Sequence, residues 1–220
     1  MRGGPPAARG PLAVLDSIRQ ARPLVPGERC EMCANPIPET HSHVVDIRNR
    51  SLMCACRACY LLFTRDDAKL AYRSVPDRYM SFPSFELTPS QWDDLAIPVG
   101  IAFFFAHSEL ERIAAFYPSP AGATESELPL DAWQQIVDAN PGLETLKPDV
   151  EAVLLREIDD SFECYIVPID SCYELVGHLR RLWRGFDGGS EVRHQLSEYF
   201  AGLAKRSRPA RRDPITGLVV

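Results

Sequence analysis

Hydrophobic and polar positions follow two different periods along this chain. Four short apolar runs, grouped in two pairs around polar turns, predict β-strands at residues 98–105 and 111–117, and at residues 150–157 and 162–167. After each pair, apolar positions recur at helical spacing, near residues 131–139 and 171–183. The strand-strand-helix unit thus occurs twice. It predicts an α+β body with a four-stranded antiparallel sheet and helices on one face.

Three helix starts carry recognisable capping signals. Thr88-Pro89-Ser90-Gln91 combines an N-cap threonine, a first-turn proline and a glutamine at the third helical position. Ser171 and Glu174 form a Ser-x-x-Glu capping box before the second apolar stripe. Ser190 is the expected N-cap of a last helix.

Changes in composition divide the chain into four parts. Residues 1–10 and 21–29 are rich in Gly, Pro and Arg, whereas the last residues are strongly basic. We therefore expect a disordered segment with one short helix and a linker at 1–29, a metal-binding module at 30–85, an acidic α+β domain at 86–204 and a basic disordered tail at 205–220.

Five cysteines fall within thirty residues of the module. Two Cys-x2-Cys pairs, Cys30 with Cys33 and Cys56 with Cys59, are 22 residues apart, which is the ligand spacing of four-thiolate metal sites. A hairpin is predicted between the pairs, with its turn at 48–50, and a helix follows Cys59. A knuckle, a hairpin and a helix that carries the second pair resemble a treble-clef zinc finger.

Zinc is the expected metal, and its role is structural, because four thiolates leave no position for water or substrate. Iron in a rubredoxin-like site is the alternative, although Ala34 and Tyr60 stand where rubredoxin knuckles carry glycine. Cys54 is a second candidate for the third ligand, or a small buried residue near the site. His41 and His43 are candidates for contacts around the ligands, or ordinary surface histidines.

The net charge of −6 conceals an uneven distribution. Residues 86–174 contain 3 basic and 18 acidic side chains, a net −15, whereas the segments on either side are basic. Such a body repels phosphate backbones, so we expect a protein partner and no nucleic acid. No apolar run reaches the roughly 20 residues of a membrane span. An odd number of clustered cysteines and the lack of a secretion signal predict a cytoplasmic protein.

Residues 117–129 are predicted to form a long loop in a body whose other connections are short. Long loops in compact domains are often functional, which makes Thr124, Glu125, Glu127 and Asp131 candidates for partner binding. Thr124 and Glu127 also fit a capping box, the plainer interpretation. No histidine or lysine base lies in a recognisable motif with these acids, so we assign no catalytic residue and expect no enzyme.

Several motifs together resemble an uncharacterised actinobacterial family, from about Arg29 to Leu203. They are Cys-Glu-Met-Cys at 30–33, Leu-Met-Cys-Ala-Cys-Arg-Ala-Cys-Tyr-Leu-Leu-Phe at 52–63, Tyr-Arg-Ser-Val-Pro-Asp-Arg-Tyr at 72–79, Gly-Ala-Thr-Glu-Ser-Glu-Leu-Pro-Leu-Asp-Ala-Trp at 122–133 and Cys-Tyr-Glu-Leu-Val-Gly at 172–177. Members of that family are encoded beside high-affinity nickel-iron hydrogenases.

The resemblance implies a pathway and no chemistry. We therefore expect a non-enzymatic metal-binding accessory or maturation protein that docks a hydrogenase subunit or assembly factor. The alternative is an electron-transfer protein with an iron-thiolate centre, rubredoxin-like or iron-sulfur, at the same cysteines.

Overall fold

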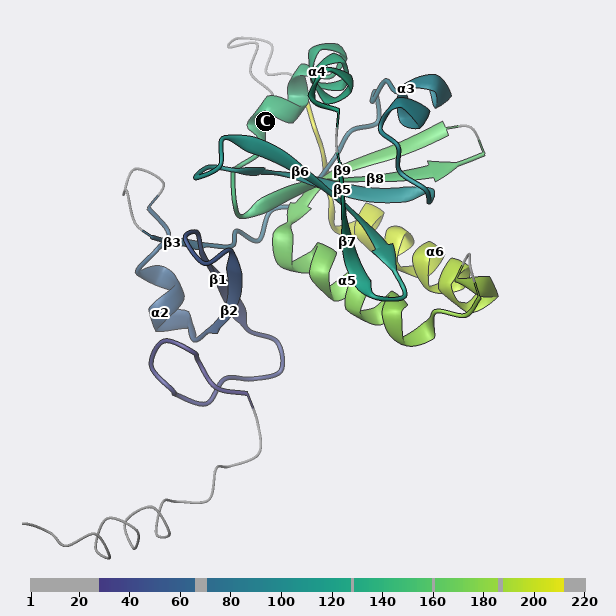
Figure 1. Ribbon diagram of the computed structural model, residues 1–220. Coiled ribbons are helices and arrows are strands. Elements are labelled where there is room, and N and C mark those ends of the chain that lie inside the picture. Colours follow the sequence, from purple (N-terminus) through teal and green to yellow (C-terminus); the bar gives the residue numbers. More distant parts are fainter. Residues whose placement is uncertain (1–27, 66–70, 128, 160, 186–187, 212–220) are drawn as a thin grey trace, which may run out of the picture.

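A small head and a larger body make up the computed structural model, which describes residues 28–65, 71–127, 129–159, 161–185 and 188–211 (Figure 1). The head contains a three-stranded sheet and one short helix, and the body contains a seven-stranded sheet between two layers of helices. The mixed α+β class is as predicted. The expected helix and linker before residue 28 lie outside the described residues.

The body sheet has the strand order β10-β4-β9-β8-β5-β6-β7, and all of its pairs except β10 with β4 are antiparallel. Its centre consists of the two strand pairs expected from the sequence. The strands are β4 (Met80–Ser81), β5 (Ile101–His107), β6 (Arg112–Ser119), β7 (Gly122–Ser126), β8 (Glu151–Ile158), β9 (Ser161–Pro168) and β10 (Arg208–Pro209).

Helices cover both faces of this sheet, and the expectation of helices on one face is wrong (Figure 1). One face packs against α5 (Ile169–Leu182) and α6 (Gly189–Arg206), with Phe103, Leu154 and Leu179 in that core. The other face packs against α3 (Pro89–Asp94), α4 (Leu130–Ala139) and the 3-10 turn η1 (Pro141–Thr145), around Phe104 and Trp133. The central strands are buried on both sides, so they read as continuous apolar runs.

Two segments predicted as loop or tail are strands. The expected long loop is mostly a hairpin, in which β7 pairs with β6 and Tyr117 lies opposite Thr124. At the other end of the sheet, β10 pairs with β4, so the chain is ordered beyond residue 204. Both strands lacked a signal in the sequence, because β7 consists of small and polar residues without an apolar alternation and β10 has only two residues.

The helix starts agree with the sequence at one position and differ at two. The last helix, α6, has Gly188 as its N-cap, so Ser190 lies inside its first turn and does not cap it. Thr88 forms the predicted capping box with Gln91. By contrast, α5 begins at Ile169 directly after β9, and no side chain caps it. Ser171 is therefore not a cap: it is buried inside the first turn, and its hydroxyl pairs with the Tyr79 hydroxyl at 2.9 Å.

The head is built on the predicted hairpin, β1 (Ser42–Asp46) with β2 (Ser51–Ala55), and β3 (Tyr72–Ser74) pairs with the other side of β1. In this register His43 faces Cys54 and Val45 faces Leu52 across the hairpin. Side chains alternate between the two faces of a strand. Val44 thus packs with Cys30 and Ala55 on one face, and Val45 joins the core of the body on the other.

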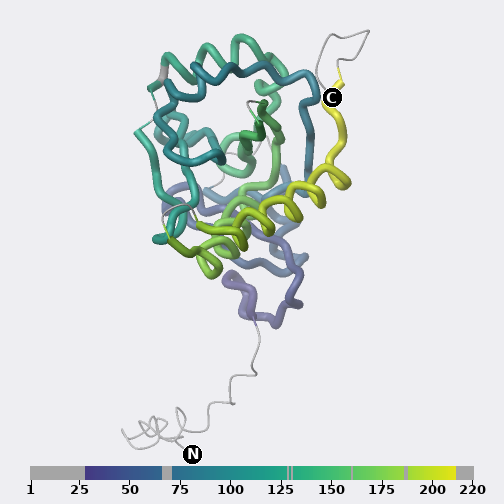
Figure 2. Tube along the Cα trace, turned by 90° about the vertical axis from the view of Figure 1, so that its right-hand side faces the viewer, coloured from purple at the N-terminus to yellow at the C-terminus, as the bar shows by residue number. Residues whose placement is uncertain are grey.

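The head sits at the N-terminal end of α5, as the turned view also shows (Figure 2). Two arginines, Arg73 in β3 of the head and Arg78 in the segment that follows it, reach carboxylates at the start of β8. Arg73 lies 3.3 Å from Asp149, and Arg78 contacts Glu151 through Nε at 2.7 Å and Nη2 at 2.6 Å. The Glu151 side chain is fully buried and also accepts the backbone N–H of Lys147.

Replacing Arg78 should destabilise the body strongly, because it leaves the buried Glu151 carboxylate without its cation. We expect Arg78→Ala to lower the free energy of unfolding by about 3 kcal/mol in urea denaturation. The control is Arg112→Ala, which breaks an exposed pair with Glu125 and should cost less than about 1 kcal/mol. An equal decrease in the free energy of unfolding in the two variants would show that the pair with Glu151 stabilises the protein no more than an exposed pair does.

Candidate metal centre

The first cysteine pair lies on a tight turn. The Cys30 N–H donates to the Asn35 carbonyl at 2.8 Å, and the Ala34 N–H donates to the Cys30 carbonyl at 2.8 Å. Ala34 adopts a left-handed φ of 60°, a conformation that glycine adopts most readily. The turn is therefore a knuckle even though alanine stands at that position.

The second pair lies at the start of α2 (Arg57–Leu61). Cys56 is the N-cap of this helix, and its Sγ accepts the Cys59 N–H at 3.5 Å. Free N–H groups at a helix start stabilise negative sulfur. The two pairs thus come from a knuckle and a helix start, which are held together by the β1–β2 hairpin.

The structure brings the four sulfur atoms of Cys30, Cys33, Cys56 and Cys59 within 4.8 Å of one another. Cys33 Sγ lies 3.7 Å from Cys56 Sγ. A tetrahedral zinc site with bonds of about 2.3 Å has sulfur–sulfur edges of roughly 3.8 Å, so the cluster has the size of a four-thiolate metal site. All seven cysteines are free thiols, and the four cluster thiols can therefore serve as ligands.

The backbone prepares this cluster for negative charge. Burial alone would raise the pKa of the Cys30 thiol, but N–H groups of Cys56, Cys33 and Met32 outweigh burial and lower that pKa to about 6. Contacts with the sulfurs of Cys33 and Cys56, and then burial, raise the pKa of Cys59 to about 12. Backbone N–H groups thus favour a thiolate at Cys30, and metal binding requires its cysteine ligands to be deprotonated.

A metal at these four sulfurs would have a full set of protein ligands. Such a centre contributes folding energy and leaves no coordination position for a substrate. It would fasten the knuckle to α2, in a head whose own core, among the described residues, has four buried members: Cys30, Ile37, Val44 and Ala55.

Cys54 and the two histidines lie apart from the four-cysteine cluster. Cys54 is on β2 opposite His43, and the chain turns at Cys56 into α2, so the two cysteines do not continue along one strand face. A ligand atom from each of His41, His43 and Cys54 lies within 4.8 Å of the others, in a separate group. Cys54 is thus neighbour to the cluster and not its third ligand, and the histidines are partners of Cys54.

The four residues proposed for a recognition loop do not form a chemical site. Thr124 is in β7 and exchanges a hydrogen bond with Ser119 at 2.8 Å, so it caps no helix. Glu125 pairs with Arg112 at 2.8 Å. Glu127 is exposed, and Asp131 lies exposed in the first turn of α4, whose N-cap is Pro129. Within the described ranges, only the two cysteine-containing groups bring three or more metal-ligating side chains together.

Comparison with known sequences identifies the family. The profile of a family of unknown function, DUF5947, matches residues 29–207, which include both cysteine pairs and nearly all of the body. The chain belongs to this family. No curated protein and no solved structure matches. Across the residues that the structure describes, no helix of this family member is long and apolar enough to cross a membrane.

The sequence did not reveal the partner of His43. In the structure, His43 Nδ1 lies 2.8 Å from Asp170 Oδ2, a residue at the start of α5 that is 127 positions away. No sequence pattern near either residue indicates a contact between positions so far apart in the chain. The pairing of His43 with Cys54, by contrast, follows from the hairpin register, which the four residues between Asp46 and Ser51 set.

Removing one cluster cysteine should release the metal and loosen the head. We expect Cys33→Ala to lower the bound metal by one ion per chain and to make the head accessible to proteolysis, because the head's small core cannot replace the metal–sulfur bonds. Metal analysis and limited proteolysis measure both effects. Cys164→Ala, in the buried part of β9, is the control and should keep its metal. A fully metal-loaded Cys33→Ala protein would contradict the assignment.

Proposed function

We propose that the protein is a non-enzymatic, zinc-binding accessory protein with a treble-clef head and an acidic body that docks a basic partner protein. The observation that carries this proposal is the closed set of four cysteine sulfurs, within 4.8 Å of one another, beside a body with a strong acidic face. Four protein ligands leave no coordination position open, which supports a structural role for the metal. Recognition of a partner would then depend on the surface of the body.

The position of the second cysteine pair favours a treble clef. A rubredoxin-like site has a knuckle at each pair, whereas here Cys56 and Cys59 begin a helix and only Cys30 and Cys33 lie on a knuckle. A knuckle, a hairpin and a helix start, in this order, support zinc over iron.

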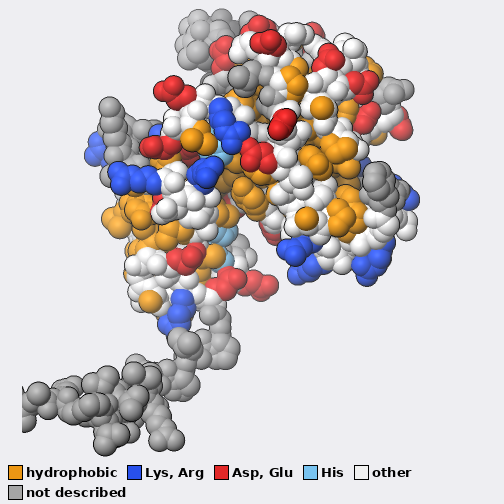
Figure 3. Space-filling model, in the orientation of Figure 1, with side chains coloured by type: hydrophobic (Ala, Val, Ile, Leu, Met, Phe, Trp, Pro, Cys, Tyr) orange, Lys and Arg blue, Asp and Glu red, His pale blue; other side chains and the backbone are white. Residues whose placement is uncertain are grey.

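The two helical layers of the body differ in charge. The layer of α3, α4 and η1 carries exposed carboxylates, which we call the acidic face: Glu86, Asp93, Asp94, Asp131, Asp138 and Glu144. Acidic side chains gather over this part of the body in Figure 3, and basic side chains gather below α5 and α6. The opposite layer carries charges of both signs: Arg180, Arg181, Arg193, Lys205 and Arg206, with Glu174, Glu191 and Glu198.

A face of one charge sign attracts a complementary surface and speeds its encounter. The acidic face thus supports docking of a basic protein surface and opposes nucleic acid. The narrower proposal, that the partner is a hydrogenase subunit or assembly factor, rests on the sequence resemblance described above and on no feature of the fold.

Co-purification from a native host tests the docking. The tagged protein should retain a basic partner at low salt and release it at high salt, because the screening length falls from about 10 Å at 0.1 M to about 3 Å at 1 M. Asp93→Asn with Asp138→Asn should weaken retention. Glu191→Gln with Glu198→Gln removes the same charge from α6, on the other layer, and should leave retention unchanged.

Two results would count against parts of this proposal separately. No partner at low salt, or equal loss in both double variants, would contradict docking through the acidic face. A salt-sensitive basic partner from outside the hydrogenase pathway would keep the docking and overturn the pathway.

Electron transfer through iron at the same cysteines is the second candidate. It is favoured by the exposure of Cys33, which brings the centre to the surface of the head. Visible absorption of protein purified without oxygen separates the candidates, since zinc-thiolate sites are colourless and iron-thiolate sites are coloured. We expect a colourless protein. A reducible visible band with stoichiometric iron would establish the electron-transfer candidate.

A further inference from the structure

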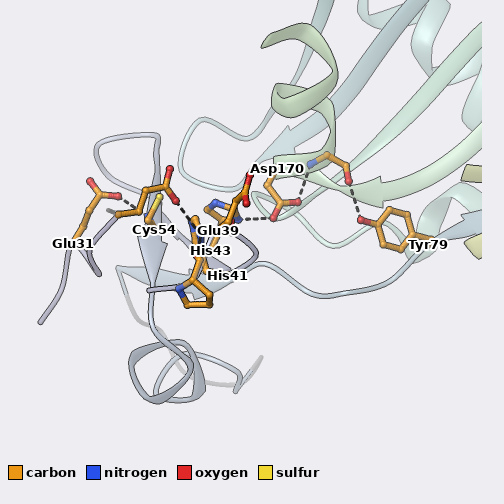
Figure 4. A network of polar contacts seen from close by, with 10 residues as sticks. Glu31, Glu39, His41, His43, Cys54, Tyr79 and Asp170 are labelled. Atoms are coloured by element: carbon orange, nitrogen blue, oxygen red, sulfur yellow. Dashed lines mark hydrogen bonds and ion pairs between the residues drawn. The ribbon is translucent and has the colours of Figure 1, made fainter. Parts of the chain in front are cut away.

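A second cluster of metal-ligating side chains lies on the side of the hairpin that faces the body. His43 and Cys54 are cross-strand partners, and His41 lies two residues before His43 on the same side of the chain. Their ligand atoms lie within 4.8 Å of one another, and the two imidazole ring centres are 4.8 Å apart. Figure 4 shows the three side chains converging at the edge of the head.

Hydrogen bonds orient both rings. His41 Nδ1 lies 3.0 Å from the Pro38 carbonyl and 3.1 Å from the Glu39 carbonyl. His43 Nδ1 lies 2.8 Å from the Asp170 carboxylate. These partners accept, so Nδ1 is the donor in both rings and Nε2 is the nitrogen left for a metal. A histidine that binds a metal through one ring nitrogen commonly donates the N–H of its other ring nitrogen to a carbonyl or a carboxylate.

His41 gives an independent indication of a ligand. Its side chain is only 7% exposed, and its Nε2 atom is buried without a hydrogen-bond partner among the described residues. A buried polar atom without a partner is destabilising, because it has lost its hydrogen bonds to water. A bound cation would remove that destabilisation.

Asp170 is itself held in place from the body side. Its Oδ1 accepts the Ser171 N–H at 2.8 Å, and Ser171 pairs with the Tyr79 hydroxyl. Figure 4 shows this chain of contacts running from His43 through Asp170 towards Tyr79. The ring of His43, on the head, is thus oriented by a helix of the body.

We propose that His41, His43 and Cys54 form a second metal site for a borderline divalent ion such as Zn²⁺ or Co²⁺, with Asp170 as a positioning residue. Nitrogen and thiolate ligands select this class of ion. A tetrahedral site of two nitrogens and one sulfur has edges of roughly 3.5 Å, and one ligand atom from each of the three side chains already lies within 4.8 Å of the others.

This site differs from the four-cysteine centre in having an open position. Three protein ligands leave the fourth position of a tetrahedral ion to water or another ligand. His41 and His43 both line the cleft between head and body, which has a volume of about 640 Å³. That cleft is the hollow in Figure 3 with histidine side chains on its head side. The inference is independent of the proposed docking through the acidic face.

Cobalt loading of the full chain tests the second site. Protein purified without oxygen is dialysed against Co²⁺ and then against metal-free buffer, and its metals are counted. We expect two ions per chain, one of them cobalt with a thiolate-to-cobalt absorption band. Cys54→Ser and His41→Gln should each retain one ion and lose the cobalt band. His194→Gln, on the exposed side of α6, should retain two.

Asp170→Asn provides a readout outside the head. It should leave two ions at high cobalt concentration but weaken the second by about 10–100-fold, the usual effect of losing a carboxylate behind a metal-bound histidine. One ion per wild-type chain, or two in both Cys54→Ser and His41→Gln, would overturn the proposal. If those two variants lose both ions, the Asp170→Asn protein decides, and an unchanged cobalt affinity in it would overturn the proposal.

Discussion

The two faces of the β1–β2 hairpin are the constraint on which the rest of the molecule depends. Alternation along the strands sends Val44 towards the four-cysteine cluster and Val45 into the core of the body. The same alternation places His43 and Cys54 towards the body. A shift of the register by one residue would exchange the two faces. The hairpin therefore fixes the metal centre, the docking of the head and the second cluster together.

The head and the body differ in what stabilises them. The head has a small core and four converging cysteines, whereas the body has a sheet covered on both faces and an ion pair between Arg78 and the buried Glu151. The solvent-exposed sides of the body's helices do not contribute to the core, so charged residues can occupy them. The proposed recognition through the acidic face and the proposed ligation at the cleft thus involve different surfaces of the same scaffold.

Much of this fold was predictable from local pattern. The four central strands, the Thr88 capping box and the head hairpin all have strong local signals, and each is present. β7, β10 and the start of α5 were missed. For β10 and α5 a contact far along the chain decides the structure: β10 pairs with β4, and the hydroxyl of Ser171 is used by Tyr79 in place of a cap. β7 forms a local hairpin with β6, but its small and polar residues gave no strand signal.

The candidate sites show the same limit. The spacing of the four cysteines predicted their convergence, because metal ligands leave a regular pattern. The separation of Cys54 from them depends on where β2 ends, one residue after Cys54. The role of Asp170 depends on how the head docks on α5, which no local pattern records.

X-ray absorption at the metal edge of the Cys54→Ser protein tests the central claim most directly, because this variant leaves only the four-cysteine centre. The account predicts zinc with four sulfur neighbours at about 2.3 Å and no nitrogen or oxygen ligand. A shell with fewer than four sulfurs, or one completed by nitrogen or oxygen, would contradict it.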